Sequence, residues 1–362
     1  MSQIDQAGAT PLLGAGERAP SMMDVAKVAG VSHQTVSRVL NGHPSVRPAT
    51  RQRVHAAIDA LGYRRNAVAR ALVRKRTDTI GVVATGSSLH GPLSTLVSIE
   101  EAAREHEYFV SVATLRDYGV ESMNRVLEHF LAHGVDGIVV IVPHDTVAHV
   151  IDHFRAPVPI VMITSREEGR GRPSSASLSR VHVDQYRGAR AVTAHLLDLG
   201  HRDVLHVAGP QDWFDARIRV QGWRDEMQER GLDSTRLTSG DWRASSGYAI
   251  GLETADQLRA GHGPTAVFAA NDEMALGMLR AFWERGVEVP GEVSVAGFDD
   301  VVGAGYFTPP LTTVRQPFDD LGRACLRRLL DMIDATDAGS PDLETVRIQP
   351  SLAIRASTAA PR

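Results

Sequence analysis

Two side chains near the N-terminus, Gln34 and Arg38, are of the types that hydrogen-bond the edges of DNA bases. The Gln34 amide offers a donor and an acceptor together, and the forked Arg38 guanidinium can bond guanine or clamp a phosphate. His33 stands beside Gln34, and its residue type is equally compatible with a base contact and with simple exposure to solvent. These residues can read a major groove only if a helix carries them on its outer face.

The surrounding sequence predicts three short helices. Ser21 and Asp24 form a variant of the capping box, so the first helix is expected over about residues 22–29. Gly30 can end that helix in the left-handed conformation, and Ser32 can cap a second helix that runs to about residue 40. A third helix should begin at Pro48 and run to about residue 62. Two helices joined by such a tight turn are the outline of a helix-turn-helix module. The apolar residues spaced to share its interior are Val25, Ala26, Ala29, Val31, Val36 and Val39.

The same segment is rich in groups that suit phosphate. Between Ser21 and Arg76 there are eleven basic residues against two acidic ones, a net charge of +9, which leaves −13 for the rest of a chain whose total is −4. Neutralising phosphates releases counterions and drives affinity for a duplex, although charge alone would equally suit a solvated basic linker. Short polar side chains suited to phosphate contacts lie at Ser21, Ser32, Thr35, Ser37, Asn41 and Thr50.

The runs DVAKVAGVSHQTVSRVLNG and TRQRVHAAIDALGYRRNAVARAL resemble the DNA-binding headpiece and hinge of the LacI (lactose-repressor) family of bacterial transcription regulators. The resemblance implies that His33 and Gln34 set sequence specificity and that Arg38 reads the groove. It also implies that Asn66, Ala69 and Leu72 contact DNA from the hinge, with Leu72 wedged into the minor groove. The hinge segment, residues 66–73, is too short for a stable isolated helix, so we expect it to order on DNA.

Composition limits the remaining possibilities. A chain of 362 residues with 43% apolar and 23% charged residues can form two or three packed domains. Its one cysteine, Cys325, excludes an internal disulfide and a cysteine-rich zinc site. The sequence has neither an 18-residue apolar run nor a signal-peptide pattern at its start, so no membrane partner and a cytoplasmic, nucleoid-associated protein are expected.

From Thr77 onward, apolar strand-like runs alternate with helical stretches. Seven such runs predict an α/β core of two doubly wound parallel-sheet subdomains, in which ligands bind beyond the carboxyl ends of the strands. The runs are TIGVVAT, YFVSVATL, GIVVIVP, VPIVMIT, RDVLHVAGP, TAVFAAND and VSVAGFD.

Polar side chains at the ends of these runs predict a small-molecule site. Asn271 and Asp299 can give the donor and acceptor pairs that recognise sugar hydroxyls, and Arg217 can bond two hydroxyls at once. Trp242 could pack against the apolar face of a pyranose. Each residue alone is more simply a cap, a turn former or a core side chain, but together they converge on one site.

The core segments GPQDWFDARIRVQGW, FAANDEMALG, SVAGFDD and PPLTTVRQPFDDLG resemble the periplasmic-binding-protein-like domain of the same family. Ile141 and Thr164 stand where the lactose-responsive pattern has an asparagine and an aspartate, so a galactoside is one candidate effector among sugars. The resemblance implies an effector cleft lined by Leu89, Arg217, Trp242, Asn271, Asp299, Gln316 and Phe318.

The predicted domains are a tail (1–20), the helix-turn-helix headpiece (21–63), a hinge and linker (64–77), the core (78–356) and a second tail (357–362). The first subdomain should take residues 78–182 and 318–340. The second should take residues 183–317 and 341–356, including a final strand around residues 346–356. Three crossings between the subdomains would make a hinge. No leucine heptads follow the core, so a homodimer on a pseudo-palindromic operator is expected.

These observations together predict a DNA-binding transcriptional repressor whose operator affinity a sugar controls. The alternative is a sugar-binding protein of the periplasmic type without a DNA role, which the basic headpiece disfavours. The sequence has no G-x-S-x-G elbow, P-loop, metal-ligand cluster or G-x-G-x-x-G after a strand, so no catalytic residue, metal or cofactor is expected. His195, His201 and His206 have no partner pattern and are expected on helix faces and turns.

Overall fold

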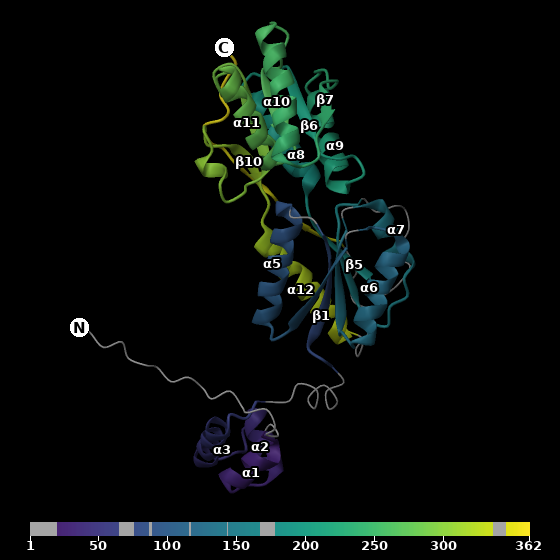
Figure 1. Cartoon of the computed structure of the whole chain (residues 1–362), viewed down its shortest axis with the longest axis vertical. Helices are drawn as coiled ribbons and strands as arrows, with labels where there is room; N and C mark the ends of the chain where they lie inside the picture. Colours follow the sequence, from purple (N-terminus) through teal and green to yellow (C-terminus); the bar gives the residue numbers. More distant parts are fainter. Residues whose placement is uncertain are drawn as a thin grey trace, which may run out of the picture. The chain divides into compact units, whose positions relative to one another are not determined.

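The computed structural model describes residues 20–64, 76–86, 89–115, 117–142, 144–166, 178–335 and 345–362. The chain divides between Thr77 and Asp78 into two compact units, and each unit is described here by itself (Figure 1). No helix among the described residues is long and apolar enough to cross a membrane.

The first unit contains the three expected helices, α1 (Met22–Ala29), α2 (His33–Leu40) and α3 (Pro48–Leu61). The capping box is present, because the Ser21 hydroxyl accepts from the Asp24 amide and the Asp24 carboxylate accepts from the Ser21 amide. Gly30 ends α1 at φ +63°, as expected. The headpiece core contains Val25, Ala26, Ala29, Val36, Val39, Val54, Ala57 and Tyr63, with the partly buried Val31 packed against it.

The described residues of the second unit form two six-stranded sheets. The first sheet has the order β11-β5-β4-β3-β1-β2 and is parallel throughout. One hydrophobic cluster joins it to α5 and α12, and another joins it to α6 and α7, so a helix pair covers each face. The strands are β1 (Thr79–Thr85), β2 (Phe109–Leu115), β3 (Gly137–Ile141), β4 (Ile160–Ile163), β5 (Leu178–Val183) and β11 (Val346–Ile348). The helices are α5 (His90–Glu105), α6 (Val120–Ala132), α7 (Asp145–His153) and α12 (Phe318–Ala335).

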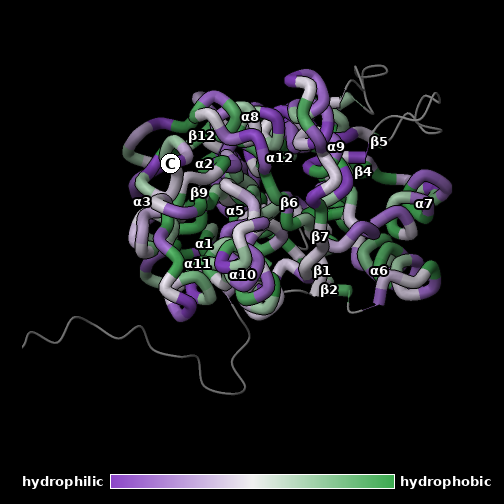
Figure 2. The backbone as a smooth tube through the Cα atoms, turned by 90° about the horizontal axis from the view of Figure 1, so that it is seen from above, coloured by the Kyte–Doolittle hydropathy of each residue, from purple (hydrophilic) through white to green (hydrophobic). Residues whose placement is uncertain are grey.

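The second sheet has the order β12-β10-β9-β8-β6-β7, and only the pairing of β10 with β12 is antiparallel among its described strands. α8 and α9 pack on one face, and α10 and α11 on the other. Figure 2 shows green and purple alternating along the helices, as expected for helices with one buried side. The strands are β6 (Val204–Ala208), β7 (Leu237–Ser239), β8 (Ala266–Ala269), β9 (Ser294–Asp299), β10 (Thr312–Arg315) and β12 (Ser351–Ala353). The helices are α8 (Gln185–Asp198), α9 (Phe214–Glu229), α10 (Ala244–Arg259), α11 (Asp272–Arg285) and the 3₁₀ turn η1 (Ala304–Tyr306).

All seven expected strands are present, but the expected final strand is wrong. Residues 346–356 form two strands of three residues each, β11 in the first sheet and β12 in the second. Pro350 lies between them, and a proline has no amide hydrogen for a sheet ladder. Residues 346–348 therefore belong to the first subdomain, not to the second.

The chain passes between the two subdomains three times, as expected, and each passage is short. Asp184 alone separates β5 from α8, while Gln316 and Pro317 separate β10 from α12. Gln349 and Pro350 separate β11 from β12. These passages place Gln185 and Gln316 at the boundary between the subdomains.

Candidate functional site

The outer face of α2 presents the three side chains whose types suit base recognition. His33, Gln34 and Arg38 are exposed, whereas Val36 and Val39 on the opposite face are buried in the headpiece core. The Ser32 hydroxyl caps the N-terminus of α2 by accepting from the Thr35 amide, which stabilises the helix that carries this face.

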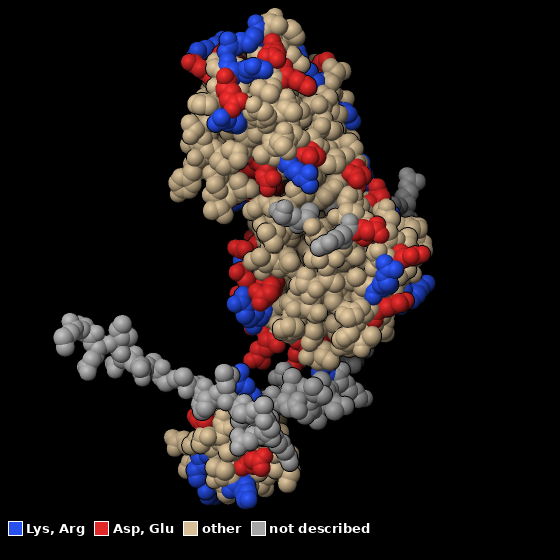
Figure 3. All heavy atoms as spheres, in the orientation of Figure 1, with Lys and Arg blue, Asp and Glu red and all other residues tan. Residues whose placement is uncertain are grey.

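The side chains predicted to contact phosphate lie at the ends of helices or within α2 and α3. Ser21 and Ser32 are helix caps, Asn41 is the C-cap of α2, and Thr35 and Ser37 are half-buried within α2. Thr50 is half-buried in the first turn of α3. Six basic residues against two acidic ones lie within residues 20–64, and Figure 3 shows basic side chains on the visible face of this unit. The predicted hinge contacts Asn66, Ala69 and Leu72 lie outside the described residues.

The second unit has a cavity of about 750 Å³, including its open mouth, between its two subdomains. The first subdomain contributes a largely apolar wall, with Leu89, Ile141 and Phe318, and Thr164 at its edge. The second subdomain and the crossing segment contribute most of the polar side chains, which are Gln185, Asp215, Arg219, Asn271, Asp299 and Gln316. The mixture of apolar walls with a few converging polar groups is typical of small-molecule sites.

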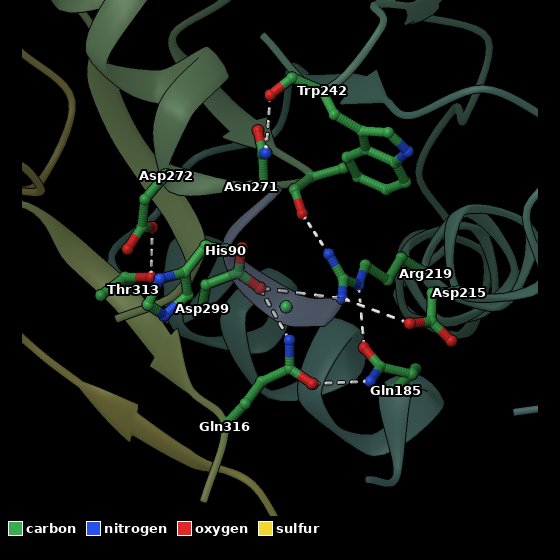
Figure 4. Close-up of polar contacts among 12 residues, drawn as sticks. His90, Gln185, Asp215, Arg219, Trp242, Asn271, Asp272, Asp299, Thr313 and Gln316 are labelled. Carbon is green, nitrogen blue, oxygen red and sulfur yellow. Dashed lines mark hydrogen bonds and ion pairs between the residues drawn. The ribbon is translucent and has the colours of Figure 1, made fainter. Parts of the chain in front are cut away.

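Arg219 is the main cation of this cavity and is held on every side. Its side chain is 4% exposed. Its Nε donates to Gln185 Oε1 at 2.9 Å, and its Nη1 donates to the Ala270 carbonyl (Figure 4). Its Nη2 lies 3.9 Å from the Asp299 carboxylate, and its guanidinium lies 3.8 Å from the centroid of the Phe298 ring. Because these contacts fix the guanidinium, Nη2 can donate to a ligand without the side chain first losing conformational freedom.

A chain of amides links Arg219 to Asp299. Gln185 Nε2 donates to Gln316 Oε1, and Gln316 Nε2 donates to Asp299 Oδ1, both at 2.7 Å (Figure 4). Burial raises the pKa of Asp299, and the charge of Arg219 opposes that shift. Because Gln185 and Gln316 come directly from the crossing segments, this network joins the cavity to the hinge.

Two residues of the cavity wall have left-handed backbone conformations. Asp299 has φ +117° and Trp242 has φ +74°. Asn271 fixes Trp242, since its Nδ2 donates to the Trp242 carbonyl at 2.8 Å while its Oδ1 caps α11 through the Met274 amide. Such conformations cost on the order of 1–3 kcal/mol each and gather at ligand sites.

Next to this wall, Asp272 accepts a hydrogen bond from Thr313 Oγ1 at 2.6 Å (Figure 4). It also accepts one from the Val301 amide at 2.9 Å. Burial is the main cause that raises the pKa of Asp272 to about 8. Asp272 is not part of the cavity wall. The hydrogen bond from Val301 fixes the loop that follows β9, and Asp299 is the last residue of β9.

Six of the seven side chains expected in the cleft do line the cavity, but the expected place of Arg217 is wrong. Its Nη2 instead bonds the Asp145 carboxylate at 2.9 Å, and its Nη1 bonds the Gln211 carbonyl. Two positions on a helix differ by about 200°, so Arg217 and Arg219 face opposite ways. Helical periodicity could have identified Arg219, because it falls on the buried stripe of α9 formed by Ala216, Val220, Trp223 and Met227. The six side chains that line the cavity as expected are Leu89, Trp242, Asn271, Asp299, Gln316 and Phe318.

Of the three histidines without a partner pattern, one lies elsewhere than expected. His195 is on α8 and His201 follows that helix, but His206 is in β6 and fully buried. Its Nδ1 donates to the Phe268 carbonyl at 2.9 Å, and burial lowers its pKa to about 3. All three therefore have structural contacts outside the cavity. Across the described ranges, no group of three His, Cys, Asp or Glu side chains is arranged to hold a metal ion.

Known proteins match both units. The model of the bacterial regulatory proteins of the lacI family matches residues 21–66, and that of the periplasmic binding protein-like domain matches residues 193–358. The lactose operon repressor of Escherichia coli (strain K12) is 33% identical over 94% of this chain and 93% of its own length. The HTH-type transcriptional regulator CelR of Thermobifida fusca is 36% identical over 87% of this chain and 92% of its own.

The chain belongs to the LacI family of bacterial regulatory proteins. The fold agrees with this over nearly the full length. A crystal structure of the lac repressor dimer bound to operator and the anti-inducer ONPF matches with a TM-score of 0.79 at 32% identity, over 95% of this chain and 100% of that one. A CelR–cellobiose complex matches with a TM-score of 0.66 at 32% identity, over 93% and 99% of the two chains. This LacI-family chain is therefore a DNA-binding transcription regulator, and its curated relatives are regulators rather than enzymes.

Proposed function

We propose that this protein represses transcription as a homodimer bound to a pseudo-palindromic operator, and that a sugar in the cavity of the core releases it. The observation that carries the proposal is the position of the Arg219, Asp299 and Gln316 network, which faces a cavity between two subdomains joined by short crossings. A ligand that bonds both walls favours one angle between the subdomains over another.

The chemistry of the cavity favours a polyhydroxylated ligand. Arg219 supplies forked donors and Asp299 supplies acceptors, while the Trp213 and Trp242 rings offer apolar surface to the face of a pyranose. The names of the relatives agree, since they include the lactose and ribose operon repressors and CelR with cellobiose. Ile141 makes this part of the first-subdomain wall apolar, so a polar partner for one sugar hydroxyl is missing there. A galactoside is therefore only one candidate among such sugars.

On DNA, we assign the major groove to Gln34 and Arg38, with His33 beside them, and the minor groove to Leu72 of the hinge. Asn66 and Ala69 would accompany Leu72 in the paired hinge segments of the dimer. When the effector changes the angle between the subdomains, these hinge segments unpair, and the wedge and its phosphate contacts are lost together. A protein that acts on chromosomal operators would work in the cytoplasm, associated with the nucleoid, and would release its effector unchanged. The phosphate contacts assigned to the headpiece are Ser21, Ser32, Thr35, Ser37, Asn41 and Thr50.

A ligand screen tests this function. Sugars, sugar phosphates and nucleobases are added to the full chain in a thermal-shift assay, and each hit is then titrated by calorimetry and added to the operator complex. We expect a sugar to raise the melting temperature and to weaken operator binding. Stabilisation by a nucleobase alone, or by a sugar that leaves operator affinity unchanged, would overturn the proposal.

A pair of variants then locates the site. Arg219→Lys keeps the charge but loses the forked donors, so we expect the effector affinity to fall more than about tenfold while operator affinity stays unchanged. Arg224→Lys is the matched control on the same helix, because Arg224 does not line the cavity. Equal losses in the two variants would contradict the assignment.

A further inference from the structure

A set of contacts at the mouth of the cavity joins the two subdomains away from the chain crossings. We call it the rim clasp, and it consists of His144 and Asp145 from the first subdomain and Asp212, Trp213 and Arg217 from the second. His144 and Trp213 form an isolated antiparallel β-bridge. Arg217 Nη2 lies 2.9 Å from Asp145 Oδ2, and His144 Nδ1 lies 3.5 Å from Asp212 Oδ2.

The rim clasp is anchored on both sides. In the first subdomain, the His144 ring lies 4.3 Å from the Tyr118 ring, centroid to centroid. In the second, Arg217 Nη1 bonds the Gln211 carbonyl at 2.9 Å, and the guanidinium lies 4.9 Å from the Phe214 ring centroid. The Arg217 side chain therefore ties the loop before α9 to α9 itself while it also reaches Asp145 across the mouth.

The rim clasp leads directly to the cavity wall through Trp213. The His144 ring meets the Trp213 ring edge-on at 5.0 Å, and Trp213 meets Trp242 edge-on at 5.7 Å. Both tryptophans line the cavity, whereas His144, Asp145, Asp212 and Arg217 do not. These four residues can therefore influence a ligand only through the position of Trp213 and the closure of the subdomains.

We infer that His144, Asp145, Asp212 and Arg217 are positioning residues that hold Trp213 over the cavity and keep the subdomains closed before the effector arrives. The inference rests on the proposed function, because the rim clasp is inferred to influence how tightly the core binds the effector. When a binding-competent form is only partly populated, the apparent dissociation constant is the intrinsic one divided by the populated fraction. Weakening the clasp therefore weakens effector binding without removing any contact to the effector.

The size of the effect follows from exposure. The side chains of Arg217 and Asp145 are 37% and 65% exposed, so solvent screens their ion pair. Exposed ion pairs contribute little free energy, which corresponds to a change of about two- to fivefold in the ratio of closed to open forms. We expect Arg217→Ala and Asp145→Ala each to weaken effector affinity by up to that factor.

The charge-swapped double variant Arg217→Asp with Asp145→Arg is the decisive comparison. It restores the ion pair in the opposite sense but not the contacts of Arg217 with Gln211 and Phe214, so we expect it to recover part of the affinity lost by either swapped single variant. Asp203→Ala is the matched control, because the Arg236–Asp203 pair has similar exposure and lies within the second subdomain. A loss in the control equal to that in Arg217→Ala, or no recovery in the double variant, would overturn the inference.

A measurement without effector separates this inference from the proposed function. Spin labels at Glu128→Cys on α6 and Glu253→Cys on α10 report the distance between the subdomains in the full chain, since both residues are exposed and Cys325 is buried. We expect one main distance in the parent chain, a broader and longer distribution in Arg217→Ala, and a return in the charge-swapped variant. An unchanged distribution in Arg217→Ala would refute the clasp whatever ligand the cavity binds, whereas failure of every sugar to bind would refute only the proposed function.

Discussion

Replacing Arg219 with methionine would keep the bulk of the side chain in the cavity wall and remove its charge and its forked donors. The Asp299 carboxylate, whose side chain is 8% exposed, would then lose a cation 3.9 Å away. At an effective dielectric constant of about 20, two unit charges at that distance attract by roughly 4 kcal/mol. Since breaking a buried pair leaves an uncompensated charge, we expect the free energy of unfolding of the core to fall by about 3–5 kcal/mol.

Tryptophan fluorescence during urea unfolding of the full chain measures this loss. All four tryptophans lie in the unit that begins at Asp78, so the signal reports the core and not the headpiece. Arg224→Met on the same helix is the control for loss of a charge outside the cavity. We expect that control to cost well under the Arg219→Met value.

A double-mutant cycle with Asp299→Asn tests the cause. If the cost of Arg219→Met comes from the stranded carboxylate, the double variant should be more stable than the sum of the two single losses by at least about 1 kcal/mol. Losses that add to within about 0.5 kcal/mol would refute the view that these two side chains act as one buried unit.

Two other predictions concern the headpiece and the core. Arg38→Ala should weaken operator binding by about 1–3 kcal/mol in a titration at fixed salt and leave binding to random DNA nearly unchanged. Equal losses on both DNAs would show that Arg38 contacts phosphate rather than a base. His206 is neutral in the folded core down to about pH 3, whereas the unfolded chain takes up the proton near pH 6.5. The contribution of His206 to stability is therefore complete above pH 6.5 and is lost as the pH falls, by at most about 1.4 kcal/mol per pH unit. His206→Phe should show a shallower loss between pH 7 and pH 4.5 in urea midpoints, and parallel curves for variant and parent would contradict the assignment.

Local chemistry made the headpiece predictable from its sequence. The capping box of Ser21 and Asp24, the left-handed Gly30 and the Ser32 cap each act within a few residues, so the three helices lie where the sequence places them. The face of α2 that carries Gln34 and Arg38 follows from the same periodicity.

Long-range pairing explains what the sequence did not reveal in the core. β5 was missed because its residues LSRVHV do not form an apolar run, and Ser179 and Arg180 become buried only when β4 and β11 pair on either side. The split of β11 from β12 likewise depends on which sheet each three-residue strand joins. Arg219 is a different case, because the helical stripe on which it lies can be read from the sequence.

The three passages between the subdomains limit how the core can move. Each contains only one or two residues between regular elements, and such a tether spans at most about 3.6 Å per residue, so the halves can turn about this strip but cannot separate. Gln185 and Gln316 stand at that pivot, whereas Thr79 begins β1, a strand of seven residues and hence roughly 23 Å, whose C-terminal end faces the cavity. A turn of about 15° would carry the start of β1 through roughly 6 Å of arc. The bound molecule would thus act close to the pivot, where displacements are small. The chain just before β1, which leads to the headpiece, lies far from the pivot and would move the most.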